Sequence, residues 1–410
     1  MQRIGLFIPS PPEHNAHVIN SVSLYSSLAE LYPDREFIWI TMNPRLEGEF
    51  INPERYLADY GLEEYSSICN VQVRNCAHLV KDEFHPQVEE LEDFILQLNC
   101  SALYMHFYPP FWETVRQICA QHQILFGLHV KIFYRKPGLP FYFEHDSTAL
   151  KAIQNIDFLS VSQEQDRVEL NQSFGIPLEK MVVLPKSVPQ QILANARQGI
   201  LSSGVKELAA HLFQGKSQSG IKQIGYIGRF EEIKNITWFL ENCLPQLQDL
   251  HPQFHLTLVG TGSLLEEVKA KVESYGNVTI LSQVLGYQDT LALLSRFDLV
   301  IYPSGFDFSP RLPLESLLMG KRCVLTDVHF NHRYRPYALM VPSIEDQESL
   351  IEYNDAKICF ALPETSVFVT TLRDFIMKPL EEFLVPESLE AESDPKFVAK
   401  RLVDYIDAYR

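Results

Sequence analysis

Two carboxylates separated by seven residues are the groups in this chain best suited to chemistry. Asp307 lies just beyond the apolar run 298–303, and Glu315 follows within a segment of helical character. Carboxylates accept strong hydrogen bonds from hydroxyl groups, and the N-terminus of a helix attracts phosphate. This spacing therefore suits a site that binds the hydroxyl groups of a sugar or a ribose through hydrogen bonds.

A pair of cations follows another apolar run, 222–228. Arg229 comes directly after Gly228, and Lys234 is five residues further on. Gly228 allows a ligand to approach the backbone closely. Arginine offers a planar fork and lysine a point charge, so the two could converge on a diphosphate. A surface loop that happens to carry two cations is the alternative interpretation.

Another glycine-containing turn, 260–263, follows the apolar run 254–259. Gly260 suits a tight turn, although such a motif alone is weak. Ser263 is placed to cap the next helix, with Glu266 three residues on as in a capping box.

These motifs lie at the ends of predicted strands, because short apolar runs alternate with helical patterns along the chain. The predicted strands are 3–8, 36–41, 67–73, 101–106, 124–129, 157–162, 180–184, 222–228, 254–259, 278–281, 298–302, 322–325 and 357–360. The predicted helices are 17–31, 87–98, 110–121, 163–174, 235–248, 263–274, 288–296 and 312–319. Such alternation predicts parallel sheets covered by helices on both faces.

The alternation breaks over residues 186–221, where the polar stretch 215–220 indicates a boundary. A chain of 410 residues favours two domains, which we place at 1–190 and 191–394. The amphipathic segment 395–410 is expected to pack back on the first domain.

Composition limits the classes of function. The formal net charge of −17 provides no basic field, so nucleic acid is not an expected partner. No apolar run approaches the roughly 20 residues that a membrane span needs. The seven scattered cysteines are typical of buried thiols in a reducing compartment, which favours a cytoplasmic protein.

Taken in order, the motifs resemble the donor-binding domain of GT-B glycosyltransferases, specifically the large retaining family four (glycosyl transferases group 1). Segment 228–235 is similar to the family's G-R-x(n)-K-G motif, 259–263 to its V-G-x-G-P turn, and 277–304 to its N-V-x-F-L-G-x-V…D-x-x-V-x-P-S stretch. Asp307 and Glu315 occupy the positions of its E-x7-E signature. In the first half, 158–162 and 174–185 resemble its V-S…G-I-P…P-N-G run.

The resemblance implies an α/β, GT-B architecture of two doubly wound Rossmann-like domains facing across a cleft. It also implies a role for each matching residue. Arg229 and Lys234 would hold the donor diphosphate, with Gly228 and Gly260 at the turns. Glu315 would bind the ribose, and backbone near Val284 would face the base.

The donor sugar would be contacted by a second group of residues. In this family pattern it would meet Asp307, the backbone N–H groups of Phe308 and Ser309, and His129. His106 ends the preceding predicted strand. For either histidine, a polar cap at a strand end is the alternative interpretation.

The sequence departs from the family pattern at four places. The first signature carboxylate is Asp307, one methylene shorter than glutamate. The loop 9–17 lacks the family's glycines, the P-N-G turn is replaced at 185–187, and residues 328–332 replace a glycine pair.

The function implied is transfer of a sugar from a nucleotide-diphosphate sugar, such as a UDP- or GDP-sugar, to a soluble, glycan, protein or small-molecule acceptor. Retention of configuration is expected. We expect no metal and no separate cofactor, since no D-x-D motif is present. The alternatives are a non-catalytic GT-B subunit that stabilises a partner glycosyltransferase or protein client, and another GT-B enzyme such as an epimerase or phosphorylase. A homo-oligomer is also compatible with the sequence.

Overall fold

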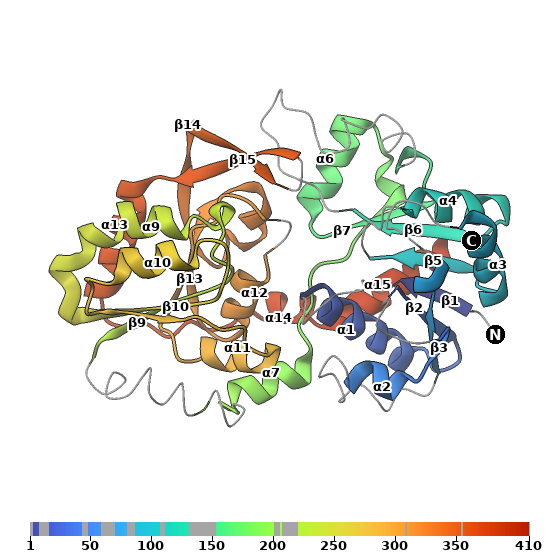
Figure 1. The fold of residues 1–410 in the computed structure, drawn as a ribbon, viewed down its shortest axis with the longest axis horizontal. Coiled ribbons are helices and arrows are strands. Elements are labelled where there is room, and N and C mark those ends of the chain that lie inside the picture. Colours follow the sequence, from blue (N-terminus) through green and yellow to red (C-terminus); the bar gives the residue numbers. More distant parts are fainter. Residues whose placement is uncertain are drawn as a thin grey trace. The chain divides into compact units, whose positions relative to one another are not determined.

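The computed structural model describes residues 3–7, 16–42, 48–58, 70–79, 87–106, 111–130, 153–200, 206, 220–307, 310–353 and 356–409. Contacts divide these residues into two units. Unit 1 contains the described residues up to 130, 153–189 and 391–409, and unit 2 contains those in 190–390. Figure 1 shows the elements of both units.

Unit 1 is built on an eight-stranded sheet in the order β3-β4-β2-β1-β5-β6-β7-β8. Neighbouring strands are parallel except for β3 and β4. The strands are β1 (Arg3–Phe7), β2 (Glu36–Thr41), β3 (Phe50–Ile51), β4 (Val71–Asn75), β5 (Ala102–Met105), β6 (Leu125–His129), β7 (Phe158–Val161) and β8 (Met181–Val183).

The helices of unit 1 include α1 (Ala16–Leu31), α2 (Pro53–Ala58), α3 (Val88–Leu98), α4 (Trp112–Gln121), α6 (Glu164–Phe174) and α15 (Pro395–Ala408). Short 3₁₀ turns lie at η2 (Ala77–Leu79) and η4 (Leu178–Lys180). The central strands β5, β6 and β7 are buried along almost their whole length, as expected for a parallel sheet covered on both faces.

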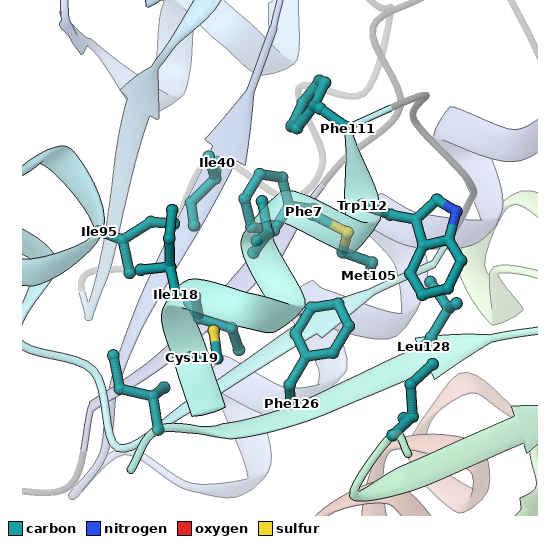
Figure 2. Packing of buried hydrophobic residues seen from close by; sticks show 14 of the residues in the cluster. Phe7, Ile40, Ile95, Met105, Phe111, Trp112, Ile118, Cys119, Phe126 and Leu128 are labelled. Atoms are coloured by element: carbon teal, nitrogen blue, oxygen red, sulfur yellow. The ribbon is translucent and has the colours of Figure 1, made fainter. Parts of the chain in front are cut away.

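The core of unit 1 forms where α4 meets the sheet. Figure 2 shows Trp112, Ile118 and Cys119 of this helix gathered with Phe126 and Leu128 of β6. The C-terminal helix packs in the same unit. Figure 1 shows α15 beside α1, and Lys396 Nζ bonds Glu30 Oε1 at 2.5 Å.

Unit 2 has a seven-stranded sheet in the order β11-β10-β9-β12-β13-β14-β15. All pairs are parallel except β14 with β15. The strands are β9 (Lys222–Ile227), β10 (Phe254–Val259), β11 (Val278–Leu281), β12 (Leu299–Tyr302), β13 (Arg322–Asp327), β14 (Leu339–Tyr353) and β15 (Ala356–Pro363).

The α-helices of unit 2 include α7 (Gln190–Arg197), α9 (Ile236–Asn242), α10 (Leu265–Val272), α11 (Tyr287–Leu294), α12 (Arg311–Leu318), α13 (Thr365–Met377) and α14 (Glu387–Glu392). Three 3₁₀ segments are η5 (Glu232–Lys234), η6 (Leu244–Gln253) and η7 (His329–Tyr334). The predicted helix 235–248 ends early, because Pro245 near the start of η6 has no N–H to continue the helical hydrogen bonds.

Among the described residues, no helix is both long and apolar enough to cross a bilayer.

Candidate donor site

The candidate donor site lies at the carboxyl edge of the unit 2 sheet. The chain runs from β9 to β10 and β11 on one side, and then returns to place β12 on the other side of β9. The order of strands therefore reverses between β9 and β12. Open α/β sheets bind ligands at such a point, beyond the carboxyl ends of the strands.

Lys234 and Asp307 meet at this reversal. Lys234 ends η5, after β9, and its Nζ lies 2.5 Å from Asp307 Oδ2, beyond β12. The hydroxyl of Tyr302 donates to the same carboxylate oxygen and lies 3.3 Å from the ammonium group. Burial, followed by the charge of Asp307, raises the pKa of Tyr302 well above its ordinary value. A neutral phenol, a cation and a carboxylate thus form one cluster.

Asn235 holds this cluster in place. Its backbone is left-handed, with φ 53°, at the position where the family motif has glycine, and asparagine tolerates that conformation. Its side-chain amide donates to Pro303 O at 3.1 Å and to Ala361 O at 3.0 Å. Gly305 N also donates to Ile233 O, at 3.2 Å. The turn bearing Lys234 is therefore tied directly to the turn bearing Asp307.

The two glycine turns approach each other at the same edge. Gly228 N donates to Val259 O at 2.9 Å. Gly260 has φ 150°, and a side chain there would collide with the backbone oxygen of Gly228. Only glycine fits this approach without displacement.

Arg229 and Val284 are exposed at the ends of β9 and β11, and Val284 keeps 74% of its surface accessible. Both side chains are thus accessible at the edge where the family resemblance predicts the diphosphate and the base. Phe308 and Ser309 lie outside the described residues.

Glu315 is buried within α12 and forms an ion pair with Arg311. Arg311 Nε donates to Glu315 Oε1 at 2.7 Å, and their side chains are only 7% and 6% exposed. Arg311 Nη2 also donates to the hydroxyl of Tyr287, whose ring lies 4.9 Å from the guanidinium carbon. The carboxylate predicted to bind ribose is therefore held by a neighbouring cation on its own helix.

Sequence reasoning missed Tyr302, Tyr287 and Arg311 as members of the site. A signal for Arg311 was present in the sequence, since Arg311 lies four residues before Glu315 and next to the predicted helix 312–319. In the structure every residue of α12 is buried. A buried arginine and a buried glutamate at that spacing are expected to pair.

His129 belongs to unit 1 and ends β6. Its Nδ1 lies 2.9 Å from Ser160 Oγ, and its Nε2 lies 3.3 Å from Ser162 Oγ. Tyr104, which is fully buried, lies 2.7 Å from Ser160 Oγ through its hydroxyl. The ring of His106 is 4.7 Å from that of His129.

This chain of hydrogen bonds predicts a tautomer of His129. Burial raises the pKa of Tyr104 well above its ordinary value, so its hydroxyl keeps its hydrogen. Ser160 Oγ is the described partner of that hydroxyl, so we expect the phenol to donate to it. We then expect Ser160 to donate to Nδ1 of His129 and the ring proton to lie on Nε2. In this tautomer Nε2 of His129 donates to Ser162 Oγ, which lies 3.3 Å away.

Replacing Ser160 with alanine should release this tautomer. In the wild type, ¹⁵N NMR of the His129 ring should show a protonated Nε2, whereas Ser160→Ala should show a mixture of tautomers. Ser162→Ala is the matched control and should keep Nε2 protonated. A wild-type ring protonated at Nδ1 would contradict the assignment.

The part of the chain described contains no cluster of three or more His, Cys, Asp or Glu residues able to hold a metal ion.

Comparison with known proteins confirms the predicted resemblance. The family model described as Glycosyl transferases group 1 matches residues 221–353, which lie in unit 2 and include the residues described above from Gly228 to Glu315. A protein of Bacillus subtilis named "Putative glycosyltransferase EpsF" is 31% identical over 107 residues. That stretch covers 25% of this chain and 27% of EpsF, so it spans only about a quarter of the relative's length.

Solved structures resemble the chain over nearly its whole length. A glycosyltransferase from Rickettsia africae has a TM-score of 0.66 and 14% identity, covering 99% of this chain and 98% of its own. Trehalose-6-phosphate synthase OtsA has a TM-score of 0.68 and 12% identity, covering 100% and 99%. HepE from Anabaena, in complex with UDP-glucose, has a TM-score of 0.63 and 14% identity, again covering 100% and 99%. The predicted α/β fold of the GT-B type is thus confirmed.

Proposed function

We propose that the chain is a glycosyltransferase that moves a sugar from a uridine-diphosphate sugar to an acceptor hydroxyl, with retention of configuration and without a metal. The observation that carries the proposal is the meeting of Lys234 and Asp307 between β9 and β12. Arg229 follows β9, and the Arg311–Glu315 pair lies on α12, which follows β12. This cluster lies in the segment that matches the glycosyltransferase family. The uridine base is proposed from the UDP-glucose complex of HepE.

The proposed roles of the side chains follow from the charge that develops on the departing diphosphate. Departure of the sugar leaves negative charge on a diphosphate, and preorganised cations stabilise it in the transition state. Arg229 and Lys234 supply that charge in this proposal, and Asp307 contacts the hydroxyls of the sugar. In a retaining front-face reaction the departing phosphate accepts the acceptor's proton, so no separate base is required. Glu315, oriented by Arg311, accepts hydrogen bonds from the ribose.

A non-catalytic GT-B subunit remains the second candidate. Each of the two predicted carboxylates is already paired with a cation of the same unit, at 2.5 Å for Asp307 and 2.7 Å for Glu315. A structural protein could keep such pairs without binding a donor. Nucleotide binding separates the two candidates.

Thermal unfolding in the presence of UDP, GDP, ADP and TDP provides that test. A ligand that binds only the folded state at 100 times its dissociation constant stabilises it by about 2.7 kcal/mol. We expect UDP alone to raise the midpoint, and Arg229→Ala to lose most of the shift. Arg322→Ala is the control, because Arg322 lies at the amino end of β13, and this variant should keep the shift. No shift with any nucleotide on folded protein would favour the non-catalytic candidate.

A further inference from the structure

A surface cavity of about 420 Å³ lies at the amino edge of the unit 2 sheet. Three of the described residues that line it are cations. Lys321 directly precedes β13, Arg296 lies three residues before β12, and Arg197 ends α7. The volume falls within the range of roughly 300–1,000 Å³ that is usual for small-molecule sites. The cavity is thus large enough for a small ligand and is lined by positive charge.

This cavity and the candidate donor site lie at opposite edges of the same sheet. The strands β12 and β13 are parallel neighbours. Arg296 and Lys321 come before these strands, whereas Asp307 follows β12. The six residues of β13 alone span about 20 Å. A small ligand in the cavity would therefore not reach the residues assigned to the donor.

The charges of Arg296 and Lys321 are not neutralised by an ion pair. Among the described residues, neither side chain has a carboxylate partner. Burial lowers the pKa of Lys321, and the charge of Asp298 opposes this change while the charge of Arg296 adds to it. The two cations therefore lie close enough to repel each other across the cavity that they line. An anion placed between them would remove that repulsion.

Arg197 forms one wall of the cavity, and its donors are already used. Its Nη1 lies 2.7 Å from Glu390 Oε1, and its Nε and Nη2 donate to Leu318 O at 3.2 Å and 2.7 Å. Leu318 is the last residue of α12, and the free carbonyl groups of a helix end carry partial negative charge. Arg197 satisfies one of these carbonyl groups, which leaves Arg296 and Lys321 as the cations that can bind an anion.

We propose that the cavity binds a phosphate group between Arg296 and Lys321, either as free inorganic phosphate or as a small phosphate monoester. A phosphate monoester carries about two negative charges at neutral pH, which matches the two cations. Arginine binds phosphate through a planar fork of donors, and lysine adds a point charge. The site lies apart from the donor site and does not depend on the proposed function.

Calorimetric titration with inorganic phosphate and with glycerol 3-phosphate tests the site. The wild type should bind at least one of them, and Arg296→Gln and Lys321→Gln should each weaken that binding about tenfold or more. Arg296→Lys keeps the charge but loses the fork, and should fall between the wild type and Arg296→Gln. Arg322→Gln is the matched control, because Arg322 is the neighbouring cation at the same edge and pairs with Glu381 on the surface. It should bind as the wild type does, and circular dichroism and the unfolding midpoint establish that each variant is folded.

The outcomes also identify the source of the phosphate group. Tighter binding of glycerol 3-phosphate than of inorganic phosphate supports the site and assigns it to an ester, whereas the reverse order or equal affinity supports it and assigns it to the free ion. A wild type that binds neither compound overturns the proposal. Equal weakening in Arg322→Gln also overturns it, because the attraction would then come from the general charge of this edge. If binding is lost in Arg229→Ala but kept in Arg296→Gln, the phosphate lies at the candidate donor site and the proposal is wrong.

Discussion

Replacing Glu315 with alanine is expected to destabilise unit 2 by about 3–5 kcal/mol, in addition to any effect on activity. The reason is the buried pair. Arg311 Nε lies 2.7 Å from Glu315 Oε1, and the arginine side chain is 7% exposed. Without the glutamate, a buried guanidinium charge keeps, among the described residues, only the hydroxyl of Tyr287 as a hydrogen-bond partner. Loss of transfer in this variant therefore does not by itself identify a ribose contact.

Hydrogen exchange measured by mass spectrometry can locate the effect. Peptides from β12 and α12 should lose protection in Glu315→Ala, whereas peptides from β5 and α4 of unit 1 should not. Glu381→Ala is the matched control, because Glu381 pairs with Arg322 at 3.0 Å on the surface and is 81% exposed. Such surface pairs contribute about 0–1 kcal/mol.

A double replacement tests the cause. Exchanging both Arg311 and Glu315 for apolar residues of similar volume should restore much of the stability that Glu315→Ala loses, because no buried charge is left unpaired. Glu315→Gln keeps an acceptor for Arg311 and is the better variant for measuring transfer. If hydrogen-exchange protection is unchanged in Glu315→Ala, the Arg311–Glu315 pair does not contribute to the stability of unit 2 as expected.

The strands that carry the site were well predicted, because the patterns that identify them are local in the sequence. β10 and β11 have the predicted bounds, and β9 and β12 each differ by one residue at one end. Gly228 and Gly260 come directly after the last residues of β9 and β10, so their positions at the sheet edge were predictable from the strand bounds. Apolar runs flanked by glycine and proline are sufficient to place such residues at the edge of a parallel sheet.

Other features depend on contacts that no local pattern encodes. The strand β14 was missed, because residues 345–349 are mostly polar and the strand is defined by its pairing with β13 and β15. The partners of Lys234 were also not predictable, since Asp307 and Tyr302 are 73 and 68 residues away along the chain. Only the placement of β12 next to β9 brings them together.

This long-range pairing leads to a second expected result. Asp307→Asn should bind UDP about 3- to 10-fold more tightly than the wild type, which corresponds to about 0.7–1.4 kcal/mol. The carboxylate repels a diphosphate and neutralises Lys234, whose ammonium lies 2.5 Å away. Asparagine keeps an acceptor for Tyr302 and Lys234, so the cluster should remain folded. Transfer should nevertheless fall about 100-fold or more, because the proposed interaction with the sugar is weakened in the transition state.

Opposite changes in UDP affinity and in transfer rate distinguish this role from a purely structural one. The measurements are the dissociation constant of UDP by calorimetry and the rate of transfer from the UDP-sugar at saturating donor. Asp327→Asn is the matched control, since Asp327 ends the adjacent strand β13 and pairs with the exposed Arg335. It should change both quantities little. Weaker UDP binding by Asp307→Asn would contradict this prediction. It would mean that the carboxylate positions Lys234 for the diphosphate and does not reduce the attraction of Lys234 for it.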